Sequence, residues 1–213
     1  IDRSLVGSEM CIRDRWRSQD YYDSGDWRGT WNLDGGGALM NQSIHTIDLL
    51  LYLMGPIKNV RAETRLRGHT AIEVEDTAVA LCEFEGGALG VIQGSTASWS
   101  KTGHSAEIQI TGSRGSVFMA DDYFKVWEFD DETEADEIIR KEFMDQSSRG
   151  GAGAADPSAI DFSWHTRNYE DIVAAIVNKG KPKITGEEAR RAVALIAAIY
   201  ESAASGGKRV EVS

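Results

Sequence analysis

Hydrophobic and polar residues alternate in several short segments in the middle of the chain, which is the pattern of half-buried β-strands. Turn residues separate these segments, among them Glu85-Gly86-Gly87 and Ser113-Arg114-Gly115. Short turns join neighbouring antiparallel strands. The pattern therefore predicts a mostly antiparallel sheet of about six strands, over residues 60–68, 76–84, 87–99, 106–112, 115–120 and 123–129.

Three other segments have helical periodicity. The first is residues 38–54, which Gly55-Pro56 ends, and the others are residues 167–179 and 186–204. Residues 209–212 are consistent with a last short strand. Because the strands are consecutive and the helices lie toward the two ends, the fold class is α+β, an open sheet with helices packed on one face.

Two segments do not fit this pattern. Residues 130–163 begin with an acidic run and continue as a Gly/Ala-rich stretch, so we expect a mobile loop there, with room for a short helix at residues 138–144. The first residue is Ile, and SLVGSEMCIRDR is similar to translated adapter sequence. We therefore expect residues 1–15 to be non-native or a disordered terminus, and residues 16–213 to be the folded domain.

The composition narrows the function classes. The 213 residues are 41% hydrophobic, which suffices for one full core, and the formal net charge is -11. A surface this acidic repels nucleic acids and anionic lipids. There is no apolar run of about 20 residues and no signal-peptide pattern. Only two cysteines are present, at no metal-binding spacing, so we expect a cytoplasmic protein with no metal site.

The helix at residues 38–54 carries a polar stripe on an otherwise apolar sequence. At 100° per residue, Asn41, His45, Asp48 and Tyr52 fall within a narrow arc. A helix this apolar is expected to be buried, so its stripe should face a polar network or a cavity. Either His45 and Asp48 satisfy each other, or His45 lines a pocket as a general acid or base, with Asn41 binding substrate and Asp48 supporting the imidazole.

Three glycines, Gly35 to Gly37, precede this helix. They allow a tight entry with close backbone approach, and the alternative is a phosphate cradle. The second alternative is weak, because the dinucleotide fingerprint G-x-G-x-x-G is not met: position 40 is Met. Two further histidines, His69 and His104, lie in predicted turns and are expected at the surface.

The segment GGGALMNQSIHTIDLLLYLMG resembles the Gfo/Idh/MocA (glucose–fructose oxidoreductase/inositol dehydrogenase/rhizopine catabolism) family of oxidoreductases. WRGTW, VEDTAVALCEFEGGALGVIQGS, ITGSRGSVFM and the C-terminal YEDIVAAIVNKGKPKITGEEARRAVALIAAIYESAASG are similar to the family in the same order. This resemblance implies the C-terminal α+β domain alone, with the N-terminal Rossmann domain and its Glu-Lys-Pro motif missing. It also implies NAD or NADP as cofactor, bound mainly by that missing domain, a sugar or polyol substrate, and a homo-oligomer formed through the open sheet face.

The resemblance assigns roles to individual residues. His45 matches the family's catalytic histidine, and Asn41 stands where many members have Asp, so it should hydrogen-bond the substrate and leave the base role to His45. Arg28 and Tyr22 precede the glycines and could contact substrate hydroxyls or a carboxylate, or pack over the sheet. His165 opens a late helix and could reach the pocket or serve as a cap.

Three functions are consistent with these residues. The first is the substrate-binding half of an NAD(P)-dependent dehydrogenase, inactive without its cofactor domain. The second is an NAD-dependent glycoside hydrolase on the same scaffold. The third is a non-enzymatic, sheet-mediated assembly module.

Overall fold

The computed structural model describes residues 5–12, 16–101, 104–144 and 163–213. One mixed sheet dominates the described part of the chain, with eight strands in the order β7-β6-β5-β1-β4-β3-β2-β8. The strands are β1 (Leu5–Ile12), β2 (Ile57–Arg65), β3 (Thr77–Phe84), β4 (Leu89–Ser95), β5 (Ala106–Gly112), β6 (Gly115–Ala120), β7 (Tyr123–Phe129) and β8 (Val210–Glu211).

All neighbouring strands are antiparallel except β1 and β4. The predicted α+β class with a mostly antiparallel open sheet is therefore confirmed, and the six strands predicted from periodicity are β2 to β7. The predicted last strand is present as β8, at the edge beside β2.

The additional central strand, β1, differs from the sequence expectation. Residues 1–15 were expected to be non-native or a disordered terminus, whereas Leu5–Ile12 lies between β4 and β5, with Met10 opposite Ile92 on one side and Ile108 on the other. The mixed composition of this segment hides its strand character, because a central strand is recognised by the partners on both its edges. Residues 1–4 and 13–15 lie outside the described ranges.

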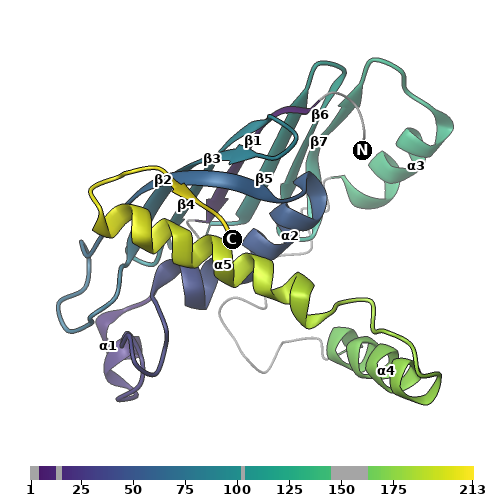
Figure 1. The fold of residues 1–213 in the computed structure, drawn as a ribbon. Coiled ribbons are helices and arrows are strands. Elements are labelled where there is room, and N and C mark those ends of the chain that lie inside the picture. The colour runs from purple at the N-terminus through teal and green to yellow at the C-terminus, as the bar shows by residue number, and fades with distance from the viewer. Residues whose placement is uncertain (1–4, 13–15, 102–103, 145–162) are drawn as a thin grey trace.

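The helices are α1 (Gln19–Asp23), α2 (Ile44–Met54), α3 (Glu134–Phe143), α4 (Ser163–Val177) and α5 (Gly186–Ala204), and a π-helical segment, η1 (Ala38–Ser43), leads into α2. Figure 1 shows α2 and α5 over one face of the sheet and α4 apart from it. No helix in the described ranges is long and apolar enough to cross a membrane.

The core lies between the sheet and the pair α2 and α5. Ile47 and Leu50 of α2, Leu195 and Ile199 of α5 and Ile92 of β4 are all at most 1% exposed. The alternation of buried and exposed residues along β3 and β4 follows from this arrangement, because only one face of these strands is covered.

Part of the predicted loop at residues 130–163 is helical. The acidic run forms the start of α3, where the side chain of Thr133 and that of Asp136 close a capping box. Carboxylates near a helix N-terminus are favourable because they face the unpaired amide groups and the positive end of the helix dipole. Asp136 also accepts a hydrogen bond from Trp127 Nε1, which attaches α3 to β7. The remainder of the predicted loop, residues 145–162, lies outside the described ranges.

Candidate functional site

The entry to α2 is a close-packed junction of three segments. The buried carboxylate of Glu75 accepts hydrogen bonds from the backbone amides of Gly37 (3.0 Å) and Leu39 (2.9 Å), and the hydroxyl of Tyr200 donates to it (3.0 Å). A Cβ atom at Gly37 would lie 1.8 Å from the carbonyl oxygen of Glu75. The glycines therefore serve close backbone approach, and the amides of Gly37 and Leu39 bind Glu75, so they are not free for a phosphate.

The π-helical geometry of η1 changes which side chains share a face. The Oγ of Ser43 donates to the carbonyl oxygen of Ala38, five residues earlier, at 2.8 Å. A wider turn shifts side chains relative to the 100° spacing of an α-helix, and such turns are frequent at functional sites. Gln42, which α-helical spacing directs away from the stripe, donates from its Nε2 to Asn41 Oδ1.

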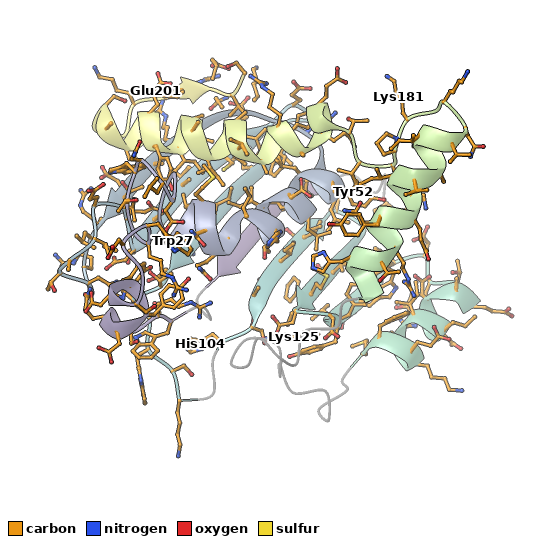
Figure 2. All side chains as sticks on the ribbon, turned by 90° about the horizontal axis from the view of Figure 1, so that it is seen from below. Trp27, Tyr52, His104, Lys125, Lys181 and Glu201 are labelled. Atoms are coloured by element: carbon orange, nitrogen blue, oxygen red, sulfur yellow. The ribbon has the colours of Figure 1, made fainter. Side chains whose placement is uncertain are left out.

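The polar stripe of α2 lies on its outer surface and not in the core. His45 and Asp48 are exposed and Tyr52 is 77% exposed, while Ile47, Leu50 and Leu51 bury the opposite side. Figure 2 shows the side chain of Tyr52, the last residue of the stripe, near the C-terminal end of α2. The prediction of a helix buried almost all round was wrong, because α2 covers the sheet with one face only.

His45 is open to an incoming ligand. No hydrogen bond or ion pair of its imidazole is found among the described residues, with Asp48 or any other. Of the two alternatives, a direct contact that satisfies His45 and Asp48 is therefore not observed. An exposed imidazole on a rigid helix, with its ring nitrogens unengaged, is suited to exchange protons with a bound substrate.

Asn41, one turn before His45, belongs to a row of polar side chains. Its Nδ2 donates to Asp34 Oδ1, and its Oδ1 accepts a hydrogen bond from Gln42 Nε2. Gln42 Oε1 in turn accepts from Arg17 Nη2 at 2.9 Å. Asp34 is fixed from its other oxygen by the backbone amide of Gly29, at 2.8 Å. A carboxylate is thus present beside position 41 although the residue there is an amide.

The site residues predicted from the sequence do not include Asp34 or Arg17. Asp34 stands directly before the three glycines, and that position was the only signal in the sequence. Arg17 lies 25 residues before Gln42, and their contact depends on how the segment between them folds back.

The other predicted site residues, Arg28, Tyr22 and His165, differ in how far they are exposed. Arg28 is half-buried, and its Nη1 donates to the carbonyl oxygen of Tyr21. Tyr22 is only 7% exposed and its hydroxyl shares a hydrogen bond with Thr96 Oγ1, so it packs in the core, and burial raises its pKa. This position does not support a substrate contact for Tyr22. His165 is exposed on α4.

His69 is buried, in contrast to the surface position expected for it. Its Nδ1 lies 3.0 Å from Asp76 Oδ2 and its Nε2 lies 2.8 Å from the carbonyl oxygen of Arg17. The turn containing His69 folds onto β3 because Asp76 also accepts hydrogen bonds from the backbone amides of Arg67, Gly68 and His69. Turn composition predicts exposure, and only this tertiary contact reverses it.

Asp76 is ionised in this setting. Burial alone would raise its pKa, but the hydrogen bonds from the amides of Gly68 and Arg67 and from His69 outweigh burial, and the pKa lies below its ordinary value. Asp76 holds His69, and His69 holds the main-chain carbonyl of Arg17. These contacts fix the backbone at Arg17, whose side chain donates to Gln42.

Comparisons with known proteins identify the family and the fold. A family model described as "Oxidoreductase family, C-terminal alpha/beta domain" (Gfo/Idh/MocA) matches residues 9–212. The crystal structure of the WlbA dehydrogenase from Bordetella pertussis in complex with NADH and UDP-GlcNAcA is 29% identical, with a TM-score of 0.82. That match covers 99% of this chain and 57% of the WlbA chain.

Curated relatives are dehydrogenases of small carbohydrates and polyols. A D-apiose dehydrogenase from Rhizobium rhizogenes is 24% identical over 176 residues, which cover 76% of this chain and 45% of that protein. A myo-inositol 2-dehydrogenase from Thermotoga maritima is 33% identical over 91 residues, 39% of this chain and 25% of that protein. The chain thus spans less than half the length of these curated relatives. It belongs to the Gfo/Idh/MocA oxidoreductase family, whose C-terminal domain model matches it almost end to end.

Proposed function

We propose that this chain, as a member of the Gfo/Idh/MocA family, is the substrate-binding half of an NAD-dependent oxidoreductase that acts on a sugar, a polyol or a sugar nucleotide. The observation that carries the proposal is the position of His45. It is an exposed and unpartnered imidazole one turn after Asn41, on a helix that the sheet and α5 hold in place. The sequence lacks the dinucleotide fingerprint and the chain spans less than half of its curated relatives, so we place NAD mainly on the remainder of the parent enzyme.

His45 is proposed to act as the general base. A substrate hydroxyl bound beside α2 would transfer its proton to the imidazole while the carbon that carries this hydroxyl is oxidised to a carbonyl. The nicotinamide, when bound, would accept the hydride from that carbon. Asn41 would orient the substrate through its amide, held by Asp34, and Gln42 would complete the polar surface.

The experiment is His45→Ala in the full-length parent enzyme, compared with Tyr52→Phe on the same helix surface. Loss of a general acid–base group lowers kcat by about 100-fold or more. We expect that loss for His45→Ala, with NADH affinity and melting temperature unchanged, and little change for Tyr52→Phe. An unchanged kcat for His45→Ala would exclude the proposed role. The 213-residue chain alone should show no saturable NADH binding in a fluorescence titration.

The uncovered face of the sheet supports a further proposal, that the protein forms homo-oligomers through it. On this face Leu81 is 59% exposed and Leu89 is 65% exposed, and Val79 is 44% exposed beside them. Leu81 lies opposite Val91 across β3 and β4, while the partner of Leu89 is Glu83, so the apolar residues form a patch with a carboxylate beside it. An exposed apolar patch of this kind is typical of a protein–protein interface.

A further inference from the structure

Two arginines lie against the same aromatic ring beside the candidate site. The guanidinium carbon of Arg28 is 4.1 Å from the centroid of the Tyr21 ring, and that of Arg17 is 5.0 Å from it. The Arg28 guanidinium also lies 5.1 Å from the ring of Trp27. Aromatic faces hold guanidinium groups flat and leave their N–H edges free to donate.

Neither arginine is neutralised within the described part of the chain. Among the described residues no carboxylate forms an ion pair with Arg17 or Arg28, although the chain carries 34 acidic residues against 23 basic ones. Their hydrogen bonds go to neutral acceptors: the carbonyl oxygens of Trp16 and Tyr21, and Gln42 Oε1. Two like charges held against one ring repel each other, and an anion between or beside them would offset this repulsion.

Both guanidinium groups also retain unused donor capacity. The Nε of Arg17 and the Nε of Arg28 are buried and have no hydrogen-bond partner in the structure. A buried donor without a partner is costly, because it has given up its hydrogen bonds to water. Both side chains are half-buried, so each also presents an accessible part.

The arginine pair is connected to the residues proposed to bind substrate. Arg17 donates to Gln42, and Gln42 donates to Asn41, which lies one helical turn before His45. An anionic group held by the arginines would therefore belong to a molecule that extends toward Asn41 and His45.

We infer that Arg17 and Arg28 bind an anionic substituent, a carboxylate or a phosphate, of the substrate whose hydroxyl is oxidised beside His45. The inference rests on the proposed function for the location of the reacting carbon. It adds that the substrate is an acidic or phosphorylated carbohydrate and not a neutral one. Guanidinium groups suit this role because they form paired, charge-assisted hydrogen bonds with either oxyanion.

The test measures binding and turnover separately in the full-length parent enzyme. D-glucuronate, D-glucose 1-phosphate and neutral D-glucose are titrated calorimetrically without cofactor, into the unaltered enzyme and into Arg17→Gln, Arg28→Gln and Arg28→Lys. Arg190→Gln, which removes the same charge from an exposed position on α5, is the matched control. Circular dichroism and melting temperature establish that each variant is folded.

We expect at least one anionic probe to bind about tenfold or more tightly than glucose, and each Gln variant to weaken that binding about 10-fold to 100-fold. Arg28→Lys should recover only part of the loss, because an ammonium cannot form the paired contact. Binding should also weaken as salt rises, while Arg190→Gln matches the unaltered enzyme. Preference for glucuronate identifies a carboxylate site and preference for the phosphate ester a phosphate site.

Equal affinity for all three probes, or variants that bind the anionic probe normally, would overturn the inference. This outcome is distinct from failure of the proposed function. A dehydrogenase that prefers neutral sugars would still reduce NAD⁺ and still depend on His45. An enzyme without NAD-dependent turnover could still bind the anionic probe through both arginines.

Discussion

Tyr200, on the last helix of the chain, donates its hydroxyl hydrogen to Glu75 Oε1 at 3.0 Å, and the same hydroxyl oxygen accepts a hydrogen bond from the amide of Gly37. This contact joins α5 to the entry of the helix that carries His45. Burial raises the pKa of Glu75, although the amides of Leu39 and Gly37 and the Tyr200 hydroxyl oppose that effect. Burial, followed by the neighbouring Glu75 charge, raises the pKa of Tyr200 as well.

The substitution Tyr200→Phe removes this hydroxyl while keeping the ring. Glu75 and the Gly37 amide each lose a partner in a buried position, so we expect a loss of about 1–3 kcal/mol in the free energy of unfolding. Urea denaturation of the 213-residue chain measures it. Tyr169→Phe on α4, where the side chain is 70% exposed, should leave the stability unchanged. Equal stability of both variants would show that the hydroxyl has no structural role.

Gly37→Ala tests the close approach at the helix entry. The added methyl group would overlap the Glu75 carbonyl, whose oxygen lies 1.8 Å from the position of the new Cβ atom. The backbone on both sides would have to move, so we expect a loss of more than about 3 kcal/mol, or failure to fold. Gly186→Ala, where a Cβ atom would meet nothing within 4 Å, should change stability by less than about 1 kcal/mol.

Substitution of His69 should lower the stability of the chain much more than substitution of His45. His69→Ala leaves the buried carboxylate of Asp76 without one of its donors and creates a cavity beside Tyr22, so we expect a loss of about 2 kcal/mol or more. His45→Ala changes an exposed side chain and should stay within about 0.5 kcal/mol. Thermal unfolding of both variants measures the two effects. A lower melting temperature for His45→Ala than for His69→Ala would contradict the structural role given to His69.

The acid stability of the chain should depend on Asp76. Its pKa in the folded state lies below the value of about 3.9 that an unfolded aspartate has, so the unfolded state binds more protons in the interval between the two. The stability contributed by ionised Asp76 is therefore present above about pH 4 and is lost as the pH falls through the folded value. Asp76→Asn should be less stable at neutral pH and should lose less stability on acidification.

Denaturant titrations between pH 2 and pH 7 measure this dependence. Glu75 contributes with the opposite sign because its folded pKa is raised, so its stabilising contribution is largest at low pH and falls as the pH rises through the folded value. The difference in unfolding free energy between the unaltered chain and Asp76→Asn, measured at each pH, gives the contribution of Asp76 apart from that of Glu75. Parallel curves for the two proteins would refute the role given to Asp76.

Charge placed on the uncovered sheet face should separate the proposed oligomer. We expect Leu81→Glu and Leu89→Glu each to shift the protein toward monomers, because a charge buried in an apolar interface is costly. Sedimentation velocity at several concentrations measures the shift. Leu33→Glu changes a residue that is 66% exposed in the segment between α1 and η1, and it should leave the assembly intact. An oligomer that survives both sheet substitutions would have to use another surface.

The sequence by itself determined the local elements and the candidate histidine. Alternation of apolar residues located β2 to β7, since a strand exposed on one face buries every second side chain. The apolar run ending at Gly55 located α2, and the polar stripe identified Asn41, His45 and Asp48. These features depend on residues close together in the chain, and local spacing is sufficient to read them.

Only the tertiary structure decided which of these side chains are accessible and which residues from distant parts of the chain contact them. It placed β1 between β4 and β5, brought Arg17 to Gln42 and Asp34 to Asn41, and buried His69 against Asp76. Each of these results is a contact between segments separated along the chain, or a change of helical pitch in η1 that such contacts hold in place. Periodicity indicates which face of an element is apolar, but the partner packed against that face settles whether a polar residue ends in the core or at a site.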